Sequence, residues 1–359
     1  MKRISIIGLG LIGGSIAKAL KNADAEINIS AFDPFITDEN FNLYKPYIDK
    51  ILSSAKESLE NSDIIFICTP LETALKQFSE LAPLLNENQI ITDVAGVKFP
   101  FEEIWKSCNS KGKYIGGHPM TGKEKGGFEN SDPLLFENAI YILTKETNDI
   151  SLLKEFEDLI HLLGANILHI PAKQHDVIAA SVSHLPQLIS VALVNTASLK
   201  TDKYNFLDLA AGGFRDMTRI ASSDFSIWES VIAQNRDEIL AAIEKFQIEL
   251  DSMKTNIEKL NLNKLKDRFE NSRKTRDEIP KNTKGFLSPL FDVFVFVKDE
   301  PGVISKISTA LFKRNINIKD IELLKIREGS GGTFRLSFES KDDSEEAKLI
   351  IQEIGFEIR

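Results

Sequence analysis

A group of glycines near the start of the chain has the spacing of a phosphate-binding turn. Gly8, Gly10 and Gly13 form a GxGxxG pattern between an apolar run at residues 3–7 and a segment with helical periodicity. The first glycine permits a tight turn, the second lets backbone approach a pyrophosphate, and the third allows close helix–strand packing. The pattern predicts a site for a dinucleotide.

An acidic residue at the end of the next apolar run indicates which dinucleotide is bound. Asp33 follows Gly13 by twenty residues. A carboxylate at that place accepts hydrogen bonds from the adenine ribose diol and repels a 2′-phosphate, so we expect NAD rather than NADP. Cofactors bind at the carboxyl ends of the strands in α/β sheets. The predicted cofactor contacts are Gly8, Gly10, Leu11, Ile12, Gly13, Asp33, Thr69, Pro70 and Asp93.

Two of the five histidines stand where an imidazole can transfer protons. His118 stands in GGHPMTGKE, just past a predicted strand of the dinucleotide-binding part of the chain. An unperturbed imidazole titrates near pH ~6.5, so it can exchange protons near neutral pH. His184, in SVSHLPQ, lies on an apolar helix that Pro186 is expected to kink or break, so it either lines a cavity or is a satisfied core histidine. The remaining three are interpreted as structural: His161, His169 and His175.

A third group of residues, in AAGGFRDMTRIASSD, is suited to binding a carboxylate. Asp216 and Arg219 are three residues apart, which places them on one face of a helix. A guanidinium braced by a carboxylate can bind a substrate carboxylate through two hydrogen bonds. A local helix ion pair is the alternative interpretation. Trp228 either lines the carboxylate-binding site or packs in the hydrophobic core.

These residues need a scaffold, and the first half of the chain alternates apolar runs with helical segments. The alternation predicts a doubly wound, mostly parallel α/β sheet of the Rossmann type over residues 1–171. Residues 172–280 predict long helices. A segment at 280–290 with two prolines and one glycine indicates a linker, and residues 290–359 have the βαββαβ order of a small ferredoxin-like α+β domain.

Composition excludes several classes of protein. A chain of 359 residues with 42% hydrophobic residues can fill two or three cores. The net charge of −9 disfavours nucleic acid and anionic membranes as partners. Two cysteines rule out a disulfide framework, and no metal site is predicted. No apolar run approaches ~20 residues, and the start of the chain is interpreted as a strand, so we expect a cytosolic protein.

The motifs together resemble the prephenate dehydrogenase family. GxGxxG with its later Asp, GGHPMTGKE, SVSHLPQ and GGFRDMTRIASSDFSIW occur in the family's order and spacing over about residues 3–250, and the tail from residue 293 resembles an ACT domain. The resemblance implies NAD-dependent oxidative decarboxylation of prephenate to 4-hydroxyphenylpyruvate in tyrosine biosynthesis. It also implies that the helical domain forms a homodimer.

The resemblance assigns roles to individual residues. His118 matches the catalytic histidine, which bonds the C4 hydroxyl of prephenate, and Arg219 matches the arginine that binds a substrate carboxylate. One departure is Gly96, because the family often has a serine there that orients the histidine. The other implied substrate-site residues are Glu124 and Asp216 in an acidic gate, His184 and Trp228 in the pocket, and Lys123 as an added cation.

The ACT resemblance implies feedback control. Asp299, Pro301 and Gly302 form the strand-to-helix turn where ACT ligands dock, and tyrosine is the expected effector; a purely structural tail is the alternative. For the whole chain, arogenate dehydrogenase is the nearest alternative function. More distant are a hydroxyacid dehydrogenase with a lysine base, which HPMTG and SHLP disfavour, and a catalytically idle regulator that senses NAD and amino acids.

Overall fold

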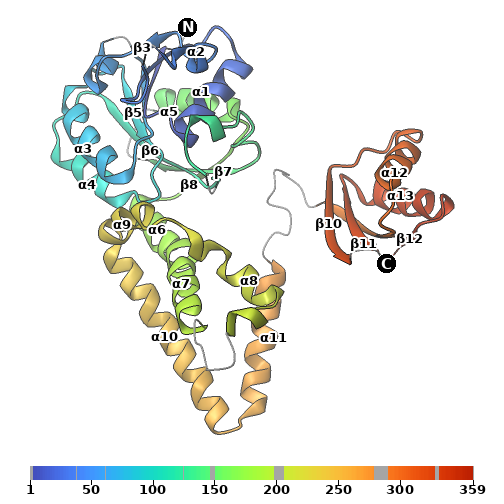
Figure 1. Ribbon diagram of the computed structural model, residues 1–359. Coiled ribbons are helices and arrows are strands. Elements are labelled where there is room, and N and C mark those ends of the chain that lie inside the picture. Colours follow the sequence, from blue (N-terminus) through green and yellow to red (C-terminus); the bar gives the residue numbers. More distant parts are fainter. Residues whose placement is uncertain are drawn as a thin grey trace. The chain divides into compact units, whose positions relative to one another are not determined.

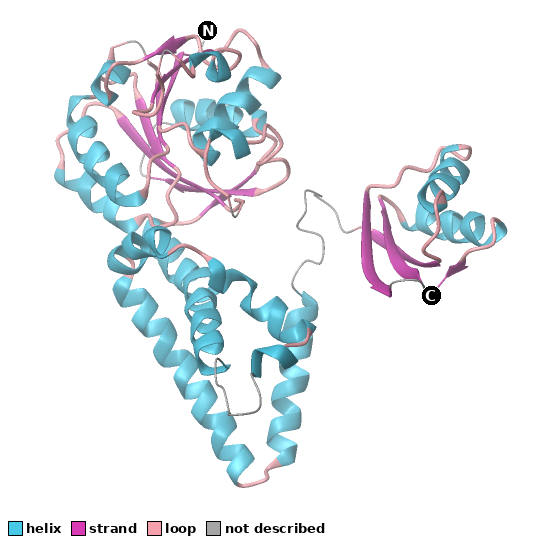
Figure 2. Ribbon diagram, in the orientation of Figure 1, coloured by secondary structure: helices cyan, strands magenta, loops and turns pink. Residues whose placement is uncertain are grey.

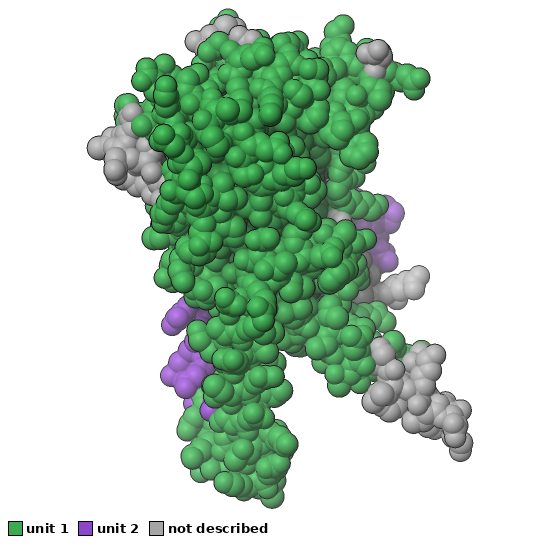
Figure 3. Space-filling model, turned by 90° about the vertical axis from the view of Figure 1, so that its left-hand side faces the viewer, with its two compact units in different colours: residues 1–267 green, residues 268–359 purple. Residues whose placement is uncertain are grey.

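The chain folds into two compact units. The computed structural model describes residues 3–37, 39–60, 62–123, 125–145, 150–197, 206–278, 290–327 and 331–358. The units comprise residues 1–267 and 268–359, which Figure 3 colours separately. The first unit holds a large sheet with flanking helices followed by a helical part, and the second holds a small sheet with two helices (Figures 1 and 2).

An eight-stranded sheet organises the first unit. Its strands are β1 (Arg3–Ile7), β2 (Asn28–Phe32), β3 (Lys50–Ile51), β4 (Ile64–Ile67), β5 (Ile90–Asp93), β6 (Lys113–Pro119), β7 (Ile140–Lys145) and β8 (Asn166–His169). Their spatial order is β3-β2-β1-β4-β5-β6-β7-β8, and every pairing is parallel except β6–β7. The sheet confirms the predicted Rossmann-type fold.

Helices cover both faces of this sheet because its strands are apolar on both sides. All four residues of β4 are buried. Phe66 packs towards Phe156 of one core, whereas Ile65 and Ile67 belong to the second core with Phe78. The helices are α1 (Leu11–Ala23), α2 (Phe41–Tyr44), α3 (Leu71–Leu81), α4 (Phe99–Ser107) and α5 (Ile150–Leu162), with short 3₁₀ turns at Ala55–Leu59, Ala82–Leu84 and Phe128–Asn130.

The helical part begins with one continuous helical stretch. α6 (Ala172–Ala179) runs through a π-helical turn, η4 (Ala180–His184), into α7 (Leu185–Ala197). Pro186, expected to kink or break this helix, does not break it; the helix is instead distorted into the wider turn before Pro186, which accommodates a residue without a backbone N–H. The later segments are η5 (Phe206–Leu209), α8 (Gly212–Thr218), η6 (Arg219–Ser222), α9 (Phe225–Gln234), α10 (Arg236–Glu258) and α11 (Leu262–Glu278).

This stretch also corrects the expectation about membrane spans. The helix Ala172–Ala197 is long and apolar enough to cross a membrane by length and composition alone, and only 28% of its most apolar window is buried. It carries His175 and His184, both buried against other elements of the first unit. We therefore interpret it as a core helix with one uncovered apolar side.

The second unit has the fold predicted for the tail. Its elements are β9 (Phe291–Val297), α12 (Val303–Phe312), β10 (Asp320–Arg327), β11 (Gly331–Phe338), α13 (Lys341–Glu353) and β12 (Glu357–Ile358). The four strands pair antiparallel in the order β10-β11-β9-β12. Alternate residues of β9, namely Val293, Val295 and Val297, fill a core beneath the two helices. This is the ferredoxin-like order.

Candidate active site

The glycine-rich turn forms one wall of a cavity of about 620 Å³. Gly8, at φ +95°, joins β1 to the start of α1, and a Cβ on Gly13 would stand 2.0 Å from the carbonyl oxygen of Gly8. No side chain fits at either place. The predicted residues Thr69 and Pro70, after β4, line the same cavity. The segment between β6 and β7 closes it with Gly127, Phe128 and Glu129.

Asp33 lies where a ribose diol is expected. Its Oδ2 accepts a hydrogen bond from the backbone N–H of Leu9 at 2.7 Å, and Oδ1 accepts one from Phe35 at 2.9 Å. Two backbone donors therefore fix the carboxylate at the cavity wall. Asp33 and Glu129 line this cavity, and none of its lining residues is a lysine, arginine or histidine. The cavity therefore suits the uncharged ribose of NAD better than a 2′-phosphate.

The N-terminus of α1 supplies the remaining feature of a dinucleotide site. The helix starts directly after Gly10, where a Cβ would meet no atom within 4 Å, so this glycine leaves space for a ligand. The first N–H groups of a helix and its dipole favour a pyrophosphate. The predicted contacts Leu11 and Ile12 lie in this first turn and are partly buried. The residues present thus fit NAD.

His118 lies near the carboxyl end of β6, at the same end of the parallel strands as the glycine turn after β1. Its ring is half-buried, and burial is the main cause that holds its pKa well below 6.5, while repulsion from the protonated forms of His175, Lys98 and His184 acts in the same direction. The imidazole is therefore neutral at physiological pH. A Cβ added to Gly96 would stand 3.7 Å from both Cε1 and Nε2 of His118, so these atoms face the loop between β5 and α4.

Asp93, one of the predicted cofactor contacts, has its side chain turned into the protein. Asp93 is fully buried and forms an ion pair with the equally buried Lys98. The hydroxyl of Tyr114 donates to its other oxygen at 2.9 Å. Lys98 also donates to the carbonyl oxygen of Gly117 at 2.6 Å, directly before His118. This buried ion pair therefore holds the end of β6 in place through the carbonyl group of Gly117.

Sequence reasoning missed the histidine that contacts His118. Nδ1 of His118 lies 2.8 Å from Nε2 of His175, and Nδ1 of His175 lies 2.7 Å from Oδ1 of Asp176. His175 had been interpreted as structural because it stands in a polar stretch. The HD pair lies in the middle of α6, but only the docking of α6 against α4 and the end of β6 reveals the contact of His175 with His118.

The second predicted histidine, His184, completes this cluster. The π-helical turn directs it inward, and only 4% of its surface is exposed. Burial lowers its pKa to about 4. Its ring packs edge-on against Trp228 at 5.9 Å between centroids, and its Nδ1 lies 3.2 Å from Nδ2 of Asn235. The structure thus brings together His118, His184 and Trp228.

The segment that carries Arg219 packs against α7, one helical turn after His184. Gln187, three residues after His184, donates to the carbonyl oxygen of Ile220 at 3.0 Å and so fixes the segment that carries Arg219. Arg219 begins η6 and Asp216 lies in α8, so they do not share one regular helix as predicted. Both side chains are exposed. Their substrate roles stay predictions.

The predicted acidic gate and its neighbouring cation lie in the segment after β6. Lys123 forms an ion pair with Asp132, with 2.9 Å between Nζ and Oδ2. That contact holds it near α1, because the hydroxyl of Ser15 in α1 accepts from the backbone of Asp132. Glu124 lies outside the described residues. In the part of the chain that the structure describes, no cluster of three or more His, Cys, Asp or Glu side chains is arranged to hold a metal ion.

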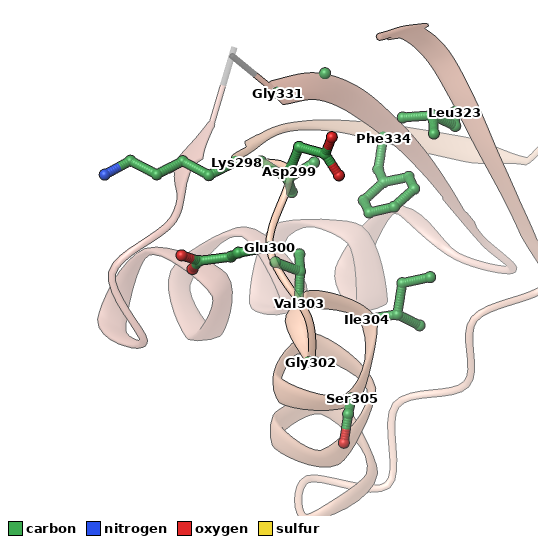
Figure 4. Close-up of a pocket in the computed structure, with 12 residues that line it drawn as sticks. Lys298, Asp299, Glu300, Gly302, Val303, Ile304, Ser305, Leu323, Gly331 and Phe334 are labelled. Carbon is green, nitrogen blue, oxygen red and sulfur yellow. The ribbon is translucent and has the colours of Figure 1, made fainter. Parts of the chain in front are cut away.

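The second unit contains a separate cavity of about 400 Å³ at the turn between β9 and α12. Asp299 and Gly302, two of the predicted effector residues, line it, and Gly302 takes φ +88° at the start of α12. Pro301 lies in the turn between them. Figure 4 shows the Asp299 side chain near Phe334 and Leu323, whereas Lys298 and Glu300 extend away from them.

Three family models match consecutive parts of the chain. Residues 16–169 match the nucleotide-binding domain of prephenate dehydrogenase, residues 171–271 its dimerization domain, and residues 291–351 the ACT domain. The prephenate dehydrogenase of Lactococcus lactis is 36% identical, and the match covers 98% of each chain.

Solved structures of the same kind match more than three quarters of the chain. The prephenate dehydrogenase of Aquifex aeolicus in complex with hydroxyphenyl propionate and NAD⁺ has a TM-score of 0.69 at 29% identity, over 78% of this chain and 98% of that one. The arogenate dehydrogenase of Synechocystis has a TM-score of 0.67 at 27% identity, over 77% and 99%.

Proposed function

Because this chain belongs to the prephenate dehydrogenase family and is an NAD-dependent dehydrogenase, we propose that it converts prephenate to 4-hydroxyphenylpyruvate. The observation that carries the proposal is the neutral imidazole of His118 at the carboxyl end of β6, in the sheet that carries the cofactor site. A neutral imidazole held there can accept the proton of a substrate hydroxyl.

The chain's own residues divide the chemistry between them. NAD⁺, when bound, supplies the hydride acceptor. Nε2 of His118 accepts the proton of the C4 hydroxyl, which favours formation of the ketone. Arg219 binds a substrate carboxylate and so fixes the ring, and positioning of this kind contributes several kcal/mol to the rate. His184 and Trp228 exclude water from one side of the ring. Loss of CO₂ from the substrate then makes the ring aromatic.

Arogenate dehydrogenase is the second candidate, since an arogenate dehydrogenase has the same fold over most of this chain. Prephenate and arogenate differ only in the keto or amino group of the side chain. Formation of NADH from purified protein with each substrate, and of NADPH in parallel, tests the proposal. We expect the highest kcat/KM with prephenate and NAD⁺. Preference for arogenate would replace the substrate assignment, and no reaction with either would reject both.

We further propose that tyrosine regulates the enzyme through the cavity of the second unit. Asp299 is exposed at its rim and can bind an ammonium group. Phe334 and Leu323 offer an apolar surface to an aromatic ring (Figure 4). An amino acid with an aromatic side chain fits this combination of one carboxylate and an apolar wall.

Calorimetry and steady-state inhibition with added tyrosine test this regulation. We expect binding to the full chain and reduced activity, with both effects weakened in Asp299→Ala. Asp342→Ala, which removes an exposed carboxylate on α13 outside the cavity, is the matched control. Absence of binding, together with unchanged activity, would leave the ACT domain without this role.

We also propose that the helical part forms a homodimer. Its internal core is small, with Ala180, Ile239 and Ala242 as the fully buried apolar residues of that cluster. Val182 on the long apolar helix is 62% exposed, and Ile248 on α10 is 68% exposed. A second copy of the chain that covers these faces would supply the missing core. The matching family model is a dimerization domain.

A further inference from the structure

A buried chain of hydrogen bonds continues from His118 into α6. His118 contacts His175, and His175 contacts Asp176, through the 2.8 Å and 2.7 Å bonds described above. His175 is 1% exposed and Asp176 is 2% exposed. Bulk water therefore does not compete for these bonds, and each ring nitrogen must find its partner inside the protein.

The positions of the protons on these rings follow from Asp176, at the far end of this chain of hydrogen bonds. Backbone N–H groups of Lys98 and Phe99 donate to Oδ1 and Oδ2 of Asp176, both at 2.8 Å. An N–H group only donates, so Asp176 is the acceptor and Nδ1 of His175 donates to it. In the neutral form of His175 this is its single N–H, which leaves a lone pair on Nε2. Nδ1 of His118 must then donate to that lone pair.

We propose that His175 and Asp176 are positioning residues that hold His118 in the tautomer with its proton on Nδ1 and its lone pair on Nε2. The inference rests on the proposed function, in which Nε2 takes the hydroxyl proton of the substrate. The O–H bond of the substrate breaks and an N–H bond forms at Nε2, so His118 becomes an imidazolium. Its Nδ1–H bond to His175 stabilises that charge.

The same reasoning assigns the opposite tautomer to His184. Nδ2 of Asn235 donates to the backbone carbonyl oxygen of Asp176 at 2.9 Å, so the amide nitrogen of Asn235 faces this side. Its second N–H points to Nδ1 of His184 at 3.2 Å. His184 therefore carries its proton on Nε2. The charged and titratable groups around His118 are His175, His184 and Lys98, with Asp176 behind His175 and Asp93 paired to Lys98.

Nitrogen NMR of the full-length protein with ¹⁵N-labelled histidine measures the tautomers directly. The chain has only five histidines, and single His→Gln variants assign their signals. At neutral pH we expect His118 and His175 to carry the proton on Nδ1 and His184 to carry it on Nε2. A proton on Nε2 of His118, or a charged His118 at neutral pH, would overturn the proposal. This readout does not depend on the substrate.

Kinetics of two variants at position 175 test the consequence for catalysis. In His175→Leu the acceptor is lost, and we expect kcat to fall roughly 10²-fold with the KM for prephenate changed less than about threefold. His175→Gln can place its Oε1 near the position of the lost Nε2, so we expect its kcat to be at least about tenfold higher than that of His175→Leu. His169→Gln, an exposed histidine paired with Glu157, is the matched control.

The outcomes separate this inference from the proposed function. Wild-type kcat in His175→Leu would overturn the positioning role, and so would a Gln variant no better than Leu. If His175→Leu does not fold, the tautomers of the wild-type protein decide the question alone. If the wild-type protein forms no NADH with prephenate, the proposed substrate is wrong, while the NMR result still accepts or rejects the tautomer assignment.

Discussion

At the scale of single residues, the chemistry of the site depends on keeping one imidazole neutral. Burial and the nearby Lys98 ammonium both lower the pKa of His118. A histidine with an ordinary pKa would be partly protonated near neutral pH and unable to accept a proton in that fraction of molecules. Lys98 therefore serves two purposes, since it fixes the end of β6 through the Gly117 carbonyl group and disfavours a charge on His118.

Replacement of His118 by asparagine removes the proposed proton acceptor. We expect His118→Asn to lower kcat by at least ~10²-fold while the KM for the substrate changes little, because the amide keeps a polar contact without accepting the proton. Steady-state assays of NADH formation measure both parameters. Turnover close to that of the wild type would contradict the role of His118.

Two glycines of the same turn should respond differently to alanine. In Gly13→Ala the new Cβ would stand 2.0 Å from the Gly8 carbonyl oxygen, so both the fold and NAD binding should suffer. In Gly10→Ala the Cβ meets no protein atom within 4 Å, so the melting temperature should stay near that of the wild type while NAD binding weakens. Thermal unfolding and NAD titration compare them. A Gly13→Ala protein with normal stability would refute the packing argument.

Residue types alone could predict part of the site. GxGxxG, Asp33 and His118 carry their chemistry in local sequence, and the structure places the turn and Asp33 on one cavity. His175 and Asp176 could not be recognised, because their role comes from a contact across 57 residues between His118 and His175. The inward direction of the Asp93 side chain could not be predicted, because a sequence shows that a residue ends a strand but not which way its side chain points.

At the scale of elements, the π-helical turn couples His184 to folding. The turn buries this imidazole against Trp228 and Asn235, and its pKa of about 4 in the folded protein lies below the ordinary 6.5. The unfolded chain therefore binds a proton first as the pH falls. The stabilising contribution of His184 is complete above pH 6.5 and is lost between about 6.5 and about 4.

A comparison of His184→Gln with the wild type isolates this contribution. Urea unfolding at about pH 7.5 and about pH 5 should show the wild type losing more stability on acidification than the variant. The pKa of His118 is lowered mainly by burial in both proteins, so most of its contribution cancels in the difference. His169→Gln, at an exposed position, should follow the wild type. Equal losses in all three proteins would contradict the link to His184.

The segment that carries Arg219 depends on α7 for its position. Gln187 holds η6 by one hydrogen bond to Ile220, next to Arg219. We expect Arg219→Ala to raise the substrate KM strongly with a smaller effect on kcat, because a carboxylate contact is lost while His118 stays in place. Arg215→Ala, on the neighbouring α8, is the control. An unaltered KM would favour a purely structural role for Arg219.

At the scale of the whole molecule, apolar surface on the helical part predicts assembly. Sedimentation should give a mass of two chains at micromolar concentration. Val182→Glu places a charge on the exposed side of the long apolar helix and should shift the protein towards single chains. Asp342→Ala, in the other unit, should leave the mass unchanged. A monomeric wild-type protein at high concentration would contradict the proposal.

Fold class was predictable because local patterns repeat across each unit. The continuous apolar strands and the βαββαβ order are properties of short segments, and the structure has the mostly parallel sheet in the first unit and this element order in the second. The course of residues 219–234 was not predictable in the same way. An Asp224 cap and a 3₁₀ turn divide a stretch of apparently uniform helical periodicity, and these depend on the packing of η6 against α7.

The path between β6 and β7 has a consequence for the order in which ligands arrive. This stretch leaves β6 next to His118, passes the cavity at Gly127–Glu129, and returns as β7, where Ile142 pairs with His118. A dinucleotide bound in that cavity would contact Gly127–Glu129, and the two ends of the loop that carries them lie beside His118. We therefore expect the coenzyme to bind before the second reactant.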